Sequence, residues 1–142
     1  SNLVWAFGTL VMRNTDLFRV VAEEAIAKAW GFGPQELANL VWAFASVGER
    51  SPMLFRVVAR EAVLKVAGAK ALEMSNIAWA FASLDVRETD LIRLATAEAT
   101  LGSQDAEPTD LMRLMWSSAR LSMQDPGLFQ TVERELIGCL GR

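Results

Sequence analysis

The sequence contains no histidine, no tyrosine and a single cysteine, Cys139. One cysteine cannot form a disulfide framework within the chain, and without histidine a structural zinc site lacks one of its usual ligands. Histidine is also the side chain that most often transfers protons in catalysis, and the sequence shows neither a glycine-rich phosphate loop nor a Ser/His/Asp set. We therefore expect a protein that is not an enzyme and that has no metal site and no other cofactor.

Long uncharged apolar runs are missing too. The longest, around residues 37–48, has about a dozen residues, fewer than the roughly 18 that a membrane-spanning helix needs. Hydrophobic residues nevertheless make up 52% of the 142 residues, and the net charge is −3. This composition predicts a folded protein without a membrane span. The negative charge argues against strong nonspecific binding of nucleic acid by this segment alone.

What the sequence does contain is one nine-residue segment in three copies: NLVWAFGTL at 2–10, NLVWAFASV at 39–47 and NIAWAFASL at 76–84. The copies begin 37 residues apart, and the same interval separates four tryptophans, Trp5, Trp42, Trp79 and Trp116. A constant interval without insertions indicates a repeat array. We place the repeats at about 1–33, 34–70, 71–107 and 108–142, as one domain over 1–142. Because Ser1 aligns with Ala38 inside a helix, we expect this array to be a fragment of a longer one.

Each repeat is predicted to form two helices. In the second repeat the first helix covers 34–47, with Pro34 in its first turn and Gly48 at its end. The second covers 52–66 and follows Ser51 as N-cap. The first helix has an apolar stripe of helical period, formed by Leu37, Leu40, Phe44 and Val47.

The predicted fold is all-α, an α-solenoid of four 37-residue helix-turn-helix repeats. No stretch of strand length alternates with a period of two, so no sheet is expected. One such helix pair cannot bury its apolar face alone, whereas stacked copies bury a continuous core. We expect the tryptophans to fill the gaps between neighbouring repeats, where each would remove roughly 150–250 Å² from water.

Opposite the apolar stripe, the first helix carries a polar stripe without charge. At 100° per residue, Gln35, Asn39 and Ser46 fall within about 40° of one another, with Trp42 at their edge. An ordinary solvated helix face would favour Glu, Lys and Arg. The stripe recurs between repeats as Asn2, Asn39, Asn76, Thr9, Ser46 and Ser83. These side chains either read base edges of RNA, one repeat per nucleotide, or bond the backbone and one another between stacked helices.

Arginines also recur in register. Arg13, Arg50 and Arg87 follow the first helix of three repeats, where spaced positive charge could contact the phosphates of a single strand. Arg113, which replaces the repeated Asn, and Arg120 complete the candidate RNA-binding residues. A second row of arginines lies early in the second helices: Arg19, Arg56 and Arg93. The alternative role for both rows is a salt-bridge ladder between repeats with the equally periodic acids Glu24, Glu61, Glu98 and Glu135.

The segment PQELANLVWAFASVG at 34–48 resembles the first-helix signature of octotricopeptide and heptatricopeptide repeats, and 37 residues is the heptatricopeptide length. The resemblance covers the whole chain. It is strongest over 34–94 and weakest in the fourth repeat, where RLMWSSARL keeps Trp116 but has Arg113 and Ser118 in place of Asn and Phe. The RAP domain that often follows such repeats has no counterpart in this sequence.

That resemblance implies an organellar protein, in the mitochondrion or alternatively the plastid. Its implied partner is single-stranded or ribosomal RNA, within a mitochondrial ribosome or an RNA-processing assembly. Helical repeats of this shape also serve as scaffolds, so the alternative is a subunit that binds other subunits of a large organellar complex.

Overall fold

The computed structural model describes residues 15–101 and 106–121, together with residues 3, 6, 129–130, 133–134 and 137–138. Across these residues every regular element is helical, which confirms the all-α prediction for this part of the chain. The elements of the two continuous ranges are α2 (Thr15–Lys28), η1 (Ala29–Gly31), α3 (Pro34–Ser46), α4 (Pro52–Lys65), η2 (Val66–Gly68), α5 (Ala71–Ser83), α6 (Thr89–Leu101) and α7 (Pro108–Arg120).

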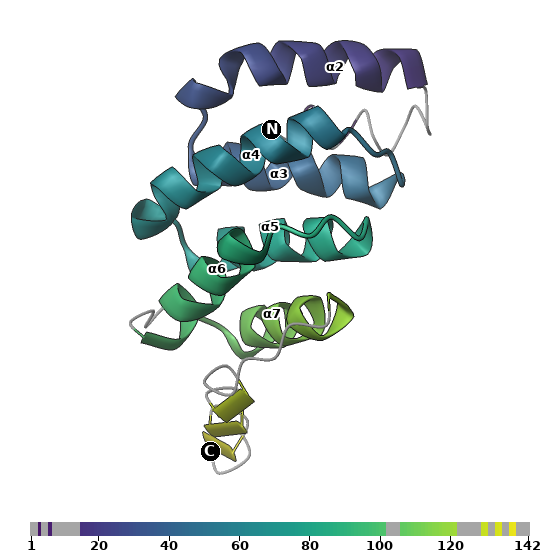
Figure 1. Ribbon diagram of the computed structural model, residues 1–142. Helices are drawn as coiled ribbons and strands as arrows, with labels where there is room; N and C mark the ends of the chain where they lie inside the picture. The colour runs from purple at the N-terminus through teal and green to yellow at the C-terminus, as the bar shows by residue number, and fades with distance from the viewer. Residues whose placement is uncertain are drawn as a thin grey trace.

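The helices form two layers (Figure 1). One layer contains α3, α5 and α7 side by side, and the other contains α2, α4 and α6. Within each layer the helices begin 37 residues apart, at residues 34, 71 and 108 in the first and 15, 52 and 89 in the second. The first helix of the first repeat and the second helix of the fourth lie outside the described residues, so the number of four repeats and the domain boundaries stay predictions.

Local signals explain where these helices begin and end. At three helix starts, the carboxylate of the third helical residue accepts a hydrogen bond from the backbone N–H of the N-cap residue, which satisfies a donor that the helix leaves unpaired. The pairs are Glu36 with Gly33 at 3.2 Å, Glu73 with Lys70 at 2.8 Å and Asp110 with Glu107 at 3.0 Å. After α3 the chain turns at Gly48, whose φ is 72°, and Asp85 takes the corresponding place after α5 with φ 55°.

The core lies between the layers. The predicted apolar stripe of α3 is buried at Leu37, Leu40 and Phe44. Phe18 of α2 packs edge-on against Phe44 with ring centroids 4.9 Å apart. One repeat later Phe55 and Phe81 make the equivalent contact at 4.9 Å, with their rings tilted by 57°. These pairs join successive repeats, because each links the second helix of one repeat to the first helix of the next.

The rings of Trp42 and Trp79 meet between neighbouring repeats, 6.1 Å apart between centroids, as predicted, but the expectation that the tryptophans are core residues is wrong for those that the structure describes. Trp42 and Trp79 are half-buried, and Trp116 is 46% exposed. On α5 it is small side chains beside the tryptophan that are fully buried, namely Ala80 and Ala82. Trp5 lies outside the described residues. In the part of the chain described, no helix is long and apolar enough to cross a membrane.

Candidate nucleic-acid interface

The layer of α3, α5 and α7 has one face that α2, α4 and α6 do not cover, and we call it the open face. On each helix it is formed by four residues at equivalent positions, all half-buried or exposed. They are Gln35, Asn39, Trp42 and Ser46 on α3, Leu72, Asn76, Trp79 and Ser83 on α5, and Thr109, Arg113, Trp116 and Arg120 on α7. The structure therefore brings together six of the predicted RNA-binding residues: Asn39, Asn76, Ser46, Ser83, Arg113 and Arg120.

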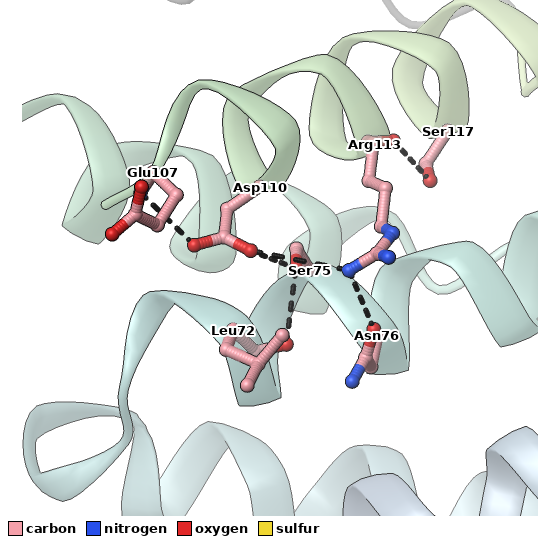
Figure 2. Close-up of polar contacts among 7 residues, drawn as sticks. All are labelled: Leu72, Ser75, Asn76, Glu107, Asp110, Arg113 and Ser117. Atoms are coloured by element: carbon pink, nitrogen blue, oxygen red, sulfur yellow. Dashed lines mark hydrogen bonds and ion pairs between the residues drawn. The ribbon is translucent and has the colours of Figure 1, made fainter. Parts of the chain in front are cut away.

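A polar cluster joins α5 to α7 at the edge of this face (Figure 2). The Nη1 group of Arg113 donates to Asn76 Oδ1 at 3.2 Å and lies 3.9 Å from Asp110 Oδ1. Asp110 is buried and accepts the backbone N–H of Glu107 through Oδ2, while the Ser75 hydroxyl lies 3.5 Å from its other oxygen. Its contacts with Asn76 and Asp110 thus hold the guanidinium in place, while 44% of the Arg113 side chain stays exposed to solvent. A guanidinium has five N–H donors, so Arg113 can bind an anion in addition to Asn76.

Asn76 supports one of the two alternatives weighed from the sequence, because its amide oxygen is already bonded between stacked helices. Asn39 differs. Among the described residues its side-chain amide has no hydrogen-bond partner, although it is only half-exposed. The hydroxyl of Ser46 donates to the Trp42 carbonyl at 2.8 Å within α3, which leaves its oxygen able to accept. Asn2 and Thr9 lie outside the described residues.

The tryptophans form a row on the open face. The rings of Trp42 and Trp79 lie 6.1 Å apart between centroids and are inclined by 32°. Trp116 continues the row at the corresponding position of α7 and is its most exposed member. Aromatic faces at one per repeat can stack on the bases of a single strand. The sequence assigned these residues to the core, although their angular position at the edge of the polar stripe indicated the open face.

The turn arginines contact the next repeat. The Arg50 guanidinium donates to the carbonyl of Leu84, and Arg87 Nη1 donates to that of Leu121 at 3.0 Å. Leu84 and Leu121 are the C-cap residues of α5 and α7, so each arginine binds a helix end where carbonyls lack partners. Arg87 also lies 3.7 Å from the Asp85 carboxylate. A phosphate contact by these arginines stays a prediction, and Arg13 lies outside the described residues.

Among the residues that the structure describes, the arginines and acids of the second helices do not form the salt-bridge ladder that was considered from the sequence. Arg19 binds Glu23 at 3.1 Å in place of Glu24. Glu24 instead pairs with Lys28 at 3.2 Å, and Glu61 pairs with Lys65 at 3.1 Å. These two acids of the ladder therefore find lysines one turn further along their own helices. Glu135 lies outside the described residues.

Residues 1–138 match the family model described as RNA-editing substrate-binding complex 6 protein. No curated protein matches the chain.

This match overturns the identification with heptatricopeptide or octotricopeptide repeats. The quoted signature consists of a helix-starting proline, small residues at close helix contacts and periodic apolar residues. Any stack of helix pairs needs these features, so they do not distinguish one repeat family from another. The chain belongs to the family of RNA-editing substrate-binding complex 6 proteins.

Proposed function

We propose that this chain is a non-catalytic subunit of an RNA-editing complex and that its open face binds single-stranded RNA. The family description supports the complex and its substrate. The observation that carries the proposal is the row Trp42, Trp79 and Trp116, which lies beside the exposed arginines of α7.

The chemistry of this face suits an unpaired strand. Stacking of a base on an aromatic side chain contributes about 1–3 kcal/mol and tolerates any base. Arg113 and Arg120 can hold phosphates alongside, and the Asn39 amide can bond a base edge. The acids nearest the helix starts, Glu36 and Glu73, have their carboxylates bonded to backbone N–H groups, so they are directed toward the N-caps. Among the residues that form the open face, the charged ones are Arg113 and Arg120, both on α7, in a chain whose net charge is −3.

The wider setting follows from the same proposal. The chain is an α-solenoid of four repeats, and it works in the mitochondrion, where RNA-editing complexes of this type act. Ribosomal RNA and the plastid were implied by the family resemblance that the comparison overturned, and nothing else favours them. An editing substrate takes the place of ribosomal RNA as the proposed partner.

The test is a double variant of the α7 arginines, Arg113→Ala with Arg120→Ala. Affinity for short single-stranded RNAs should fall alike for all sequences, and the salt dependence should flatten by about 0.7 for each phosphate that is no longer neutralised. The matched control is Arg56→Ala with Arg93→Ala, which removes two exposed arginines from the other layer. Fluorescence anisotropy over a salt series measures both effects.

If the two double variants bind RNA equally well, the open face is not the RNA surface. In that case the open face belongs to the scaffold alternative. The residue to mutate against protein partners is then Leu72, which is exposed in the first turn of α5, the middle helix of that face. Thermal unfolding of both variants, followed by circular dichroism, separates weaker binding from a failure to fold, because Arg113 also bonds Asn76.

A further inference from the structure

Helix α4 carries a row of exposed residues along one side, which we call the α4 stripe. It consists of Met53, Arg56, Arg60 and Leu64, and this spacing places the four side chains on one face of the helix. Helix α4 lies between α2 and α6 (Figure 1), and the stripe stays uncovered although both neighbouring repeats are present. Further repeats of the same array would contact only its end repeats, so they would not cover this stripe.

The α4 stripe is positively charged at its centre. The only acid of α4 is Glu61, which is buried and lies 3.1 Å from Lys65 Nζ. On α6, Arg93 occupies the position equivalent to Arg56, 37 residues later. Among the residues that the structure describes, Arg56, Arg60 and Arg93 form no ion pair with a carboxylate and no side-chain hydrogen bond. These three exposed guanidinium groups can therefore bind the carboxylates of a partner.

An apolar end follows the arginines at the C-terminus of α4. Leu64 is 72% exposed there, and the η1 turn that packs against α4 carries Trp30, which is 77% exposed. Lys65 Nζ holds this turn in place, because it donates to three carbonyl oxygens of the preceding repeat: Ala29 at 3.4 Å, Trp30 at 3.0 Å and Phe32 at 2.6 Å. Two large apolar side chains exposed at one end of a helix indicate a surface that a partner covers.

An apolar groove lies at the other end of the stripe. Met53 is 56% exposed and lines this groove, which has a volume of about 380 Å³ and runs between α2 and α4. Phe18, Ile26 and Phe44 form part of its wall. Because the groove lies between two successive repeats, a further repeat at the end of the array would not fill it. It has room for an apolar side chain from a partner.

We propose that the α4 stripe binds an amphipathic helix of another protein subunit. The acidic side chains of that helix pair with Arg56, Arg60 and Arg93. Its apolar side chains pack on Leu64 and enter the groove beside Met53. A helix suits this surface because Met53 and Leu64 lie 11 residues apart, about 16 Å along α4, which three turns of a partner helix span. The proposal does not depend on RNA binding by the open face.

Two other occupants fit the stripe less well. A second copy of the chain, paired through the same stripe about a two-fold axis, would place arginines against arginines. An RNA strand would bind the arginines but would leave Met53 and Leu64 in water, because aliphatic side chains neither stack on bases nor bond phosphates. An acidic amphipathic helix supplies carboxylates and apolar side chains together, so it matches the whole stripe.

The experiment places a photo-crosslinking amino acid at Leu64 in the full protein within its native assembly and identifies the crosslinked peptides by mass spectrometry. We expect a helical segment of another subunit, with acidic residues within two turns of the crosslinked residue. Adding Arg56→Glu with Arg60→Glu should reduce the yield at least tenfold, and replacing the partner's acids by lysine should restore it. The control, Lys28→Glu with Lys70→Glu, makes the same charge change at two exposed positions outside the stripe and should leave the yield unchanged.

Several results would overturn the proposal. These are a crosslink to RNA, to a second copy, to another segment of the same chain or to a segment without acidic residues, no crosslink at all, or equal losses in the two double variants. Arg56 and Arg60 are exposed and have no ion pair among the described residues, so their reversal should leave the melting curve unchanged. If that double variant melts earlier, Arg93→Glu alone takes its place, and an undiminished yield then overturns the proposal.

Discussion

At the scale of single residues, Arg50, Lys65 and Arg87 each donate to main-chain carbonyls of a neighbouring repeat. The periodic acids Glu24 and Glu61 were visible, and their lysine partners one turn away form a common helix pair. That Lys65 would also bind the backbone of the preceding repeat was not predictable, because main-chain carbonyls have no sequence signature. The same reason explains why the hydrogen bonds of Arg50 and Arg87 to helix-end carbonyls were not predicted, where phosphates and the periodic acids were the alternatives considered.

Replacing Lys65 by Met should therefore cost much more stability than the same change at Lys28. Lys65→Met leaves Glu61 without its cation in a mostly covered site and removes the donor to η1, which should lower the free energy of unfolding by about 2–3 kcal/mol. Lys28→Met breaks an exposed pair, which should cost about 0.5 kcal/mol or less. Urea unfolding followed by circular dichroism measures both, and equal decreases would show that Lys65 is an ordinary surface lysine.

Asn39 is the residue at which base reading can be tested most directly. If its amide bonds a base edge, Asn39→Ala should change the preference at one nucleotide position by about 1–3 kcal/mol, whereas binding of other sequences should change little. Competition among RNAs that differ at single positions measures this shift. A lower melting temperature with unchanged preference would assign Asn39 to packing between helices instead.

At the scale of helices, the residues at which each helix begins and ends could be predicted from the sequence. The residues of the open face could be predicted only in part. The predicted ranges 34–47 and 52–66 compare with Pro34–Ser46 and Pro52–Lys65, because prolines and the turn at Gly48 act locally. The polar stripe also lies where the helical projection placed it. The position of the tryptophans at the edge of that stripe also indicated the open face, but how far each ring is covered depends on how closely α3, α5 and α7 approach one another.

Two tryptophans of the same row should respond differently to removal. Trp116→Ala removes an exposed ring and should weaken RNA binding by about 1–3 kcal/mol with little effect on stability. Trp79→Ala also removes the inter-repeat contact with Trp42, so it should lower the free energy of unfolding as well. RNA titration and urea unfolding of both variants test this. Unchanged RNA affinity of Trp116→Ala would contradict base stacking at α7.

At the scale of the whole molecule, the interval of 37 residues led to the right helical class and to the wrong family. Periodicity reports the geometry of stacking, which many families share, whereas family membership depends on residues that a short motif does not contain. The same stacking geometry nevertheless predicts a strict dependence of folding on the length of any deleted segment. If each repeat packs as one unit, whole repeats can be removed and partial ones cannot.

Two deletions with junctions inside a helix test that statement. Deleting residues 42–78 removes 37 residues and joins Val41 to Trp79, so the hybrid helix keeps every side chain in register. Deleting 42–77 removes 36 and joins Val41 to Ala78, which turns the following residues by about 100° and places Trp79 at the buried site of Ala43.

The 37-residue deletion should retain its helical signal per residue and unfold cooperatively, at a lower urea midpoint than the parent because it has one interface fewer and no Lys65. The 36-residue deletion should not unfold cooperatively, since an indole cannot enter a site closed around an alanine. Circular dichroism and urea unfolding distinguish them. If both deletions fold equally well, 37 residues is not the packing unit of this protein and the solenoid proposal is wrong. If neither folds, its repeats are not interchangeable modules, and the array must be stabilised by contacts that reach beyond neighbouring repeats.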